Sequence, residues 1–194
     1  AFPILTKGLL ADLPKIFGST KAQAFIFAAS GTAMWETAIV NSLSPGDTVL
    51  AVRNGQFSHL FIDAAQRLGM KVDVIDVAWG DAAPAAVIQE RLAADAAGAI
   101  KAVLVVHNET ATGVTSDIGA VRAAMNAAKH PALLLVDGVS SVASLDFRLD
   151  EWGVDFAIAG SQKGFMMPAG LGLLCVGPKG IAAFEHAKCP RAFF

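Results

Sequence analysis

Tyrosine is absent from this chain of 194 residues, and charged residues make up only 16% of it. Tyrosine chemistry within the chain is therefore excluded. The formal net charge is -2 and no stretch is dense in lysine or arginine, which argues against nucleic acid or an anionic membrane as the main partner. No apolar run approaches the ~20 residues of a membrane-spanning helix, so we expect a soluble protein.

Cysteine is scarce as well, and the two present, Cys175 and Cys189, lack the CxxC spacing of a zinc site. We expect reduced thiols in a cytoplasmic protein and no bound metal. No basic segment followed by an apolar one opens the chain, so no signal peptide is predicted. The first residue is not methionine, and we expect the sequence to be a piece of a longer protein.

Hydrophobic residues make up 54% of the chain and fall in many short runs. Residues 1–23 predict an amphipathic lead-in helix, and residues 24–194 predict the main domain. Strands are expected at 24–28, 48–52, 71–77, 102–106, 132–136, 155–159 and 171–176, and helices at 34–43, 59–68, 84–97, 117–129 and 178–187. This alternation predicts an α/β fold with a doubly wound, mostly parallel seven-stranded sheet.

Two of these runs carry a prediction about their place in the sheet. Residues 24–28 are continuously apolar, which is typical of a strand buried on both faces of a parallel sheet. Residues 71–77 alternate between polar and apolar, which indicates an edge strand.

Ligands bind such sheets at the carboxyl ends of the strands. Gly31 and Thr32 follow the first strand and open a helix, where small residues and free N–H groups can hold a phosphate, although such turns are common in α/β folds. Phe57 follows the second strand and either packs in the core or serves as a platform for a flat ring. Thr110 lies in a polar cluster, residues 107–113, after the fourth strand.

Two ionisable residues complete this set. Asp137 directly follows an apolar strand, so its carboxylate would be buried and would need a cation, unless it caps a helix or turn. Lys163 lies in the small-residue turn at 160–164. A lone lysine on a loop is most often a surface residue, but a lysine that is desolvated or captured as an imine is a reactive group.

Together these residues supply the parts of a site for pyridoxal 5'-phosphate: a phosphate seat, a stacking ring, a buried aspartate and a lysine. The aspartate would keep the pyridine nitrogen protonated, so that the ring can accept electrons. The lysine would carry the cofactor's aldehyde as an imine.

The sequence resembles the class V, fold-type I pyridoxal-phosphate aminotransferases, and within them the serine-glyoxylate and alanine-glyoxylate branch. The matching stretches span nearly the whole chain: SGTAMWE at 30–36, NGQF at 54–57, HNETATGV at 107–114, DGVSS at 137–141 and GSQKGFMMPAGLG at 160–172. The resemblance implies that this is the large cofactor domain of such an enzyme. The small C-terminal domain of the family, with its substrate-binding arginine, is expected to be absent from this sequence.

The resemblance also implies roles for the site residues. Lys163 would form the imine and then move the proton between the substrate and the cofactor, while Asp137 would pair with the ring nitrogen. Val139 would pack on the ring face opposite Phe57. Phe57 stands where relatives often have tryptophan, and Trp35 is expected in the core.

Thr110 would hydrogen-bond near the phenolic oxygen or ring of the cofactor, and Gly31, Thr32 and Gln162 would hold the phosphate. The implied reaction moves an amino group from serine or alanine to glyoxylate, which gives glycine and a 2-oxo acid. A homodimer is implied too, because the neighbouring chain completes the phosphate site in this family.

Two other functions stay open. A different class V enzyme, such as a lyase or cysteine desulfurase, would share the fold and cofactor, but a desulfurase needs a mobile nucleophilic cysteine and Cys175 lies in a predicted strand. A non-catalytic α/β nucleotide-binding or interaction module would give no absorbance change with pyridoxal phosphate.

Overall fold

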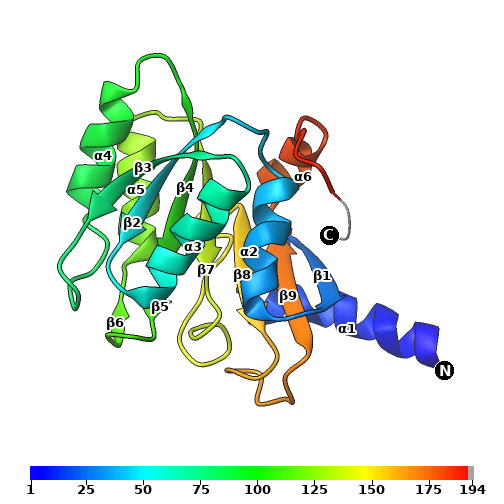
Figure 1. Cartoon of the computed structure of the whole chain (residues 1–194). Helices are drawn as coiled ribbons and strands as arrows, with labels where there is room; N and C mark the ends of the chain where they lie inside the picture. The colour runs from blue at the N-terminus through cyan, green and yellow to red at the C-terminus, as the bar shows by residue number, and fades with distance from the viewer. Residues whose placement is uncertain (192–194) are drawn as a thin grey trace.

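The computed structural model describes residues 1–191, so the last three residues of the predicted main domain lie outside the described part. Its centre is a seven-stranded sheet in the order β1-β9-β8-β7-β4-β2-β3 (Figure 1). The strands are β1 Gln23–Ala28, β2 Thr48–Arg53, β3 Lys71–Asp76, β4 Ile100–Val106, β7 Leu133–Asp137, β8 Phe156–Gly160 and β9 Leu171–Val176. The predicted seven-stranded sheet is confirmed.

The sheet is mostly parallel, as expected. Strands β3, β2, β4, β7 and β8 run parallel to one another, whereas β9 runs antiparallel to both β8 and β1. The alternating strand β3 lies at one edge, which confirms the prediction for residues 71–77.

The prediction for residues 24–28 was wrong. Strand β1 lies at the other edge, pairs only with β9, and is exposed or half-buried along its length. Ile26 packs on the core on one face of the sheet and Phe27 on the core of the other face, where Phe25 and Phe27 also line an open groove of about 300 Å³ together with Phe184. A continuous apolar run therefore marks here an edge strand that lines a groove on one face.

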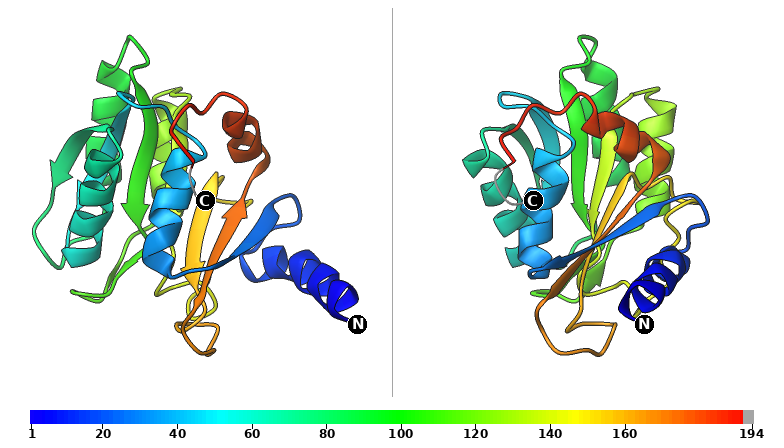
Figure 2. Two further views of the ribbon diagram at one scale, coloured as in Figure 1. Left: turned by 45° about the vertical axis from the view of Figure 1, so that its right-hand side comes forward. Right: turned by 90° about the vertical axis from the view of Figure 1, so that its right-hand side faces the viewer.

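Helices cover both faces of the sheet, so the doubly wound prediction is confirmed (Figures 1 and 2). One face carries α1, α4 and α5, and the other carries α2, α3 and α6. Their bounds are α1 Phe2–Ile16, α2 Gly31–Val40, α3 Gln56–Arg67, α4 Ala85–Ala94, α5 Ile118–Ala127 and α6 Pro178–Phe184.

Helix α1 is the lead-in helix expected within residues 1–23. Its last turns reach the core through Leu13 and the adjoining Phe17, whereas Phe2 and Ile4 are 76% and 79% exposed. The helix projects beyond the edge of the sheet next to β1 (Figure 2). Neither α1 nor any other helix within residues 1–191 has the length and apolar character needed to cross a membrane.

The polar cluster at 107–113 forms most of a small hairpin that the sequence did not predict. Strand β5, Asn108–Glu109, pairs antiparallel with β6, Val114–Thr115. The hairpin follows directly after β4, so it lies at the carboxyl end of the parallel strands.

Candidate active site

The carboxyl ends of the central strands and the first turns of α2 and α3 surround a cavity of about 110 Å³. All eight residues predicted for the site line this cavity: Gly31, Thr32, Phe57, Thr110, Asp137, Val139, Gln162 and Lys163. It is also lined by five residues that the site prediction left out: Ser30, Trp35, Val106, Asn108 and Ser140. Segments far apart in the chain thus converge on one place.

Asp137 ends β7 and is only 4% exposed. Its Oδ1 accepts the backbone N–H of Val139 at 2.8 Å, and its Oδ2 accepts the indole N–H of Trp35 at 2.9 Å. No ion pair within residues 1–191 involves Asp137. Burial raises the pKa of Asp137 to about 6, although the two hydrogen bonds and the charge of Lys163 act in the opposite direction. This carboxyl group is suited to a positively charged partner inside the cavity.

Trp35 is buried, as predicted, and its ring stacks on Phe61 with a centroid distance of 5.5 Å and an interplanar angle of 19°. The sequence did not reveal that its N–H would hold Asp137. A buried indole N–H usually has an acceptor, which was the available signal. The acceptor, however, lies 102 residues further along the chain.

Lys163 lies in the loop between β8 and β9. Ser161 closes the base of this loop, since its hydroxyl donates to the carbonyl of Pro168 at 2.7 Å and accepts the N–H of Leu171 at 3.2 Å. The side chains of Gln162 and Lys163 are exposed and line the cavity. Because β7 and β8 are neighbouring parallel strands, Asp137 and Lys163 both lie at the carboxyl end of the sheet.

Helix α2 begins at the cavity. Its N-cap residue, Ser30, makes no capping hydrogen bond with its side chain, so the N–H groups of the first turn are free of a side-chain cap. Gly31 lets the start of α2 lie close to the side chain of Val139, because a Cβ at position 31 would collide with it. Thr32 adds a hydroxyl group. Such N–H groups at the positive end of a helix can bind an anion such as a phosphate.

Phe57, in the first turn of α3, is held through its backbone. Its N–H and that of Ser58 donate to the carboxylate of Glu109 at 3.2 and 2.9 Å. Glu109 is fully buried, and Gly55 makes room for it, because a Cβ on Gly55 would collide with Glu109. The β5–β6 hairpin therefore locks the start of α3. This role of Glu109 was missed, because its sequence context showed only a polar cluster.

His107 and its neighbours separate into two groups. Asn108 and Thr110 line the cavity, whereas His107 is buried against the rings of Phe147 and Trp152, at centroid distances of 5.4 and 5.3 Å. Its Nδ1 lies 2.9 Å from the hydroxyl of Ser141. Burial lowers the pKa of His107, which favours a neutral imidazole. His107 thus supports the core behind the site.

Ser140 and Asn108 form a polar link across the cavity wall. The Ser140 hydroxyl donates to the carbonyl of Asn108 at 2.7 Å. Both residues adjoin predicted site residues at strand ends, and that position was the only sequence signal for them.

The donor set fits pyridoxal 5'-phosphate. The start of α2 suits its phosphate, and Phe57 and Val139 offer an aromatic and an aliphatic surface for its ring. Asp137 suits a protonated ring nitrogen, since each of its oxygens accepts one hydrogen bond within residues 1–191 and keeps further acceptor capacity. Lys163 supplies a primary amine for its aldehyde.

Known proteins match the chain along almost its whole length. The family model "Aminotransferase class-V" matches residues 10–189. The serine–glyoxylate aminotransferase of Methylorubrum extorquens is 62% identical over 184 residues, which cover 95% of this chain and 46% of that protein. The L-aspartate–glyoxylate aminotransferase of Paracoccus denitrificans is 57% identical over 185 residues, which cover 95% of this chain and 47% of that protein.

Solved structures show the same fold. The ureidoglycine-glyoxylate aminotransferase of Bacillus subtilis superposes with a TM-score of 0.88 at 25% identity, covering 95% of this chain and 46% of that chain. The chain therefore spans about half the length of the relatives that it matches.

Proposed function

Because the chain belongs to the class V aminotransferases, as its motifs predicted, we propose that it forms the cofactor-binding part of a pyridoxal-phosphate-dependent enzyme that transfers an amino group to glyoxylate. The products would be glycine and the 2-oxo acid of the amino donor. The observation that carries the proposal is the cavity lined by both Asp137 and Lys163, which lie at or just after the ends of neighbouring parallel strands. Asp137 is buried there and forms no ion pair within the described residues.

We propose serine as the preferred donor, because a serine–glyoxylate aminotransferase is 62% identical to the chain. L-Aspartate is a competitor, since a relative named for that donor is 57% identical. Alanine, the other donor implied by the sequence motifs, is the third candidate.

Binding and orientation would be shared among six residues. When bound, pyridoxal phosphate supplies an aldehyde that reacts with amines and a ring that accepts electrons. The first turn of α2 would hold the phosphate through backbone N–H groups, which suits an anion without adding a cation. The residues proposed to hold the phosphate are Gly31, Thr32 and Gln162, and those proposed to hold the ring are Phe57, Val139 and Thr110.

Asp137 and Lys163 would control protons. Asp137 would keep a proton on the ring nitrogen, and a cation at this position would favour the ionised form of the carboxyl group. Burial strengthens that attraction, because the site is shielded from water. The Nζ atom of Lys163 would take the proton from the donor's Cα and then give it up to the carbon of the cofactor that carried the aldehyde oxygen.

A desulfurase-like reaction lacks a suitable thiol in the described residues. Cys175 is buried in β9, and burial raises its pKa to about 12. Cys189 is also buried, and its pKa is raised for the same reason. Because the thiolate is the nucleophile in such chemistry, neither cysteine suits the role.

The cofactor site is tested by an absorbance titration of the complete protein with pyridoxal phosphate, followed by borohydride reduction and peptide mapping. We expect one cofactor per chain, trapped on Lys163. Lys163→Ala should trap none, whereas Lys71→Ala, which changes an exposed lysine at the far end of a strand, should behave as wild type. Trapping on another lysine would contradict the assignment.

The reaction is tested by incubating the loaded protein with glyoxylate and serine, alanine or L-aspartate and measuring glycine. Glycine formation is expected to be fastest with serine, and no glycine from any of the three donors would refute the proposed activity. The homodimer implied by the motifs and the cytoplasmic location inferred from the scarce cysteines stay predictions. Light scattering on the complete protein would test the first of these.

A further inference from the structure

Resting on the proposed function, we propose that Trp35 is a positioning residue that fixes the carboxylate of Asp137 for its cofactor partner. Trp35 would act through Asp137 and not by reacting itself. It lies on α2, whose first turn carries the proposed phosphate seat, so one helix would set both ends of the cofactor site.

The geometry leaves the carboxylate one orientation. The Trp35 indole N–H donates to Oδ2 at 2.9 Å and the Val139 N–H donates to Oδ1 at 2.8 Å, so each oxygen has its own donor. Rotation of the carboxylate would break both hydrogen bonds in a buried site, where unmade hydrogen bonds are costly. The remaining lone pairs of Asp137, which lines the cavity, stay available to a ligand.

The indole is itself held rigidly. Trp35 is 2% exposed and its ring stacks on Phe61 of α3. Trp35 also follows Gly31 by four residues, which is about one helical turn, so the two positions lie on the same side of α2. A shift of α2 would therefore move the phosphate seat and the donor to Asp137 together.

Two further charged residues act on Asp137 from neighbouring segments. Glu109 of β5 raises the pKa of Asp137, and Lys163 from the loop after β8 lowers it. His107, beyond the end of β4, donates its backbone N–H to the Asp137 carbonyl, and its imidazole is buried on the other side. Because the Trp35 hydrogen bond favours the ionised carboxylate, its removal should raise the pKa of Asp137.

The first test is Trp35→Phe in the complete, cofactor-loaded protein, which removes the N–H but keeps an aromatic ring. We expect kcat to fall about 10- to 100-fold, as for loss of a hydrogen bond to a charged group, with KM for the donor changed less than about twofold. The acid limb of the rate profile, and the pH at which the bound cofactor's absorbance changes, should move to higher pH. Trp152→Phe, which alters an indole on the opposite face of the sheet, is the matched control and should move neither.

The second test needs no variant and no cofactor. In the wild-type protein, the indole N–H resonance of Trp35 should titrate with Asp137 near pH 6, while those of Trp79 and Trp152 should not. A Trp35 resonance that stays constant between about pH 4 and 8 would overturn the proposal, as would a Trp35→Phe enzyme with the kcat and pH profile of wild type. If wild type itself fails to trap the cofactor on Lys163, the proposed function falls, and the resonance test still decides the link between Trp35 and Asp137.

Discussion

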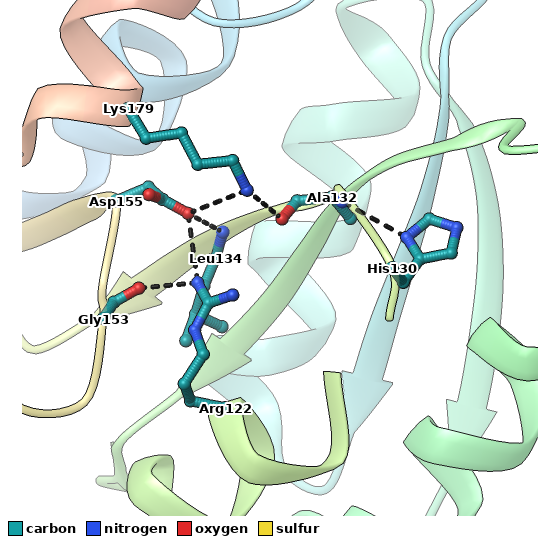
Figure 3. A network of polar contacts seen from close by, with 7 residues as sticks. All are labelled: Arg122, His130, Ala132, Leu134, Gly153, Asp155 and Lys179. Carbon is teal, nitrogen blue, oxygen red and sulfur yellow. Dashed lines mark hydrogen bonds and ion pairs between the residues drawn. The ribbon is translucent and has the colours of Figure 1, made fainter. Parts of the chain in front are cut away.

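Two buried aspartates lie at opposite ends of neighbouring strands, and they are held in different ways. Asp137 ends β7, and Asp155 directly precedes β8; they are 4% and 5% exposed. Asp155 meets two cations of its own chain, Arg122 at 3.1 Å and Lys179 at 3.9 Å, and accepts the N–H of Leu134 at 2.8 Å (Figure 3). Asp137 meets donors but forms no ion pair within the described residues.

The difference separates structure from function. Burial raises the pKa of both carboxyl groups, and near Asp155 this is opposed by Lys179, the Leu134 N–H and Arg122. The network in Figure 3 joins β7, β8, α5 and α6 at the amino end of the sheet. A buried charge is costly unless it is paired. Asp137 is buried without such a pair, and an unpaired buried carboxyl group is typical of a site that binds a charged ligand.

The largest expected effect comes from Asp137→Asn. We expect the amino-transfer half-reaction to slow at least about 1,000-fold, or about 4 kcal/mol, because the partner of the ring nitrogen loses its charge. At pH 7, where the carboxyl group is ionised, the free energy of unfolding of the cofactor-free protein should change by less than about 1 kcal/mol, because a lost acceptor is offset by removal of a buried charge. Stopped-flow absorbance measures the rate, and urea unfolding measures the stability. A half-reaction that keeps its wild-type rate would remove the distinction between the two aspartates.

Asp155→Asn should show the reverse pattern. It leaves Arg122 and Lys179 without their carboxylate, so we expect the free energy of unfolding to fall by about 3 kcal/mol. The rate per folded, cofactor-loaded molecule should stay within about threefold of wild type. Asp146→Asn is the matched control, because it breaks an exposed ion pair with Arg148 and should cost less than about 1 kcal/mol. A normal stability of Asp155→Asn would show that the network in Figure 3 contributes little.

The pH dependence of stability should sharpen the comparison. The pKa of Asp137 is about 6 in the folded protein against an ordinary value of 3.8, so the folded state keeps its proton to higher pH than the unfolded state. Its contribution to the free energy of unfolding is therefore fully present below pH ~4 and is lost as the pH rises through about 6. The loss amounts to about 3 kcal/mol. Unfolding of cofactor-free wild type and Asp137→Asn across pH 4–8 checks this. If the difference between the two proteins does not vary with pH, Asp137 is not the titrating group.

Glu109→Gln is expected to have the smallest effect. It keeps the shape but replaces one carboxylate oxygen by an NH2 group, which cannot accept. At least one hydrogen bond at the start of α3 is then lost in a buried site, so stability should fall by about 2 kcal/mol. The pKa of Asp137 should fall, because the charge of Glu109 raises it. The same unfolding series measures both. Glu36→Gln, an exposed change on α2, serves as the control and should alter neither quantity.

Much of the fold was readable from the sequence, because it depends on local pattern. The apolar runs and their spacing predicted the seven strands, the helices between them and the edge position of β3. The prediction that Asp137 and Lys163 lie close together followed from the rule that parallel strands have their carboxyl ends on the same side of the sheet. The placement of β1 failed, because a run of apolar residues does not tell a buried strand from one that lines a groove.

The sequence by itself determined the order of the elements and, through local pattern and the resemblance of its motifs, eight of the thirteen residues that line the cavity. Only the tertiary structure decided which groups hold those residues. The Trp35 bond to Asp137 spans 102 residues, and the Glu109 bond to Ser58 spans 51. The Arg122 contact with Asp155 joins segments 33 residues apart. Such contacts depend on how helices pack on the sheet, and no local pattern encodes the partner of a buried polar group.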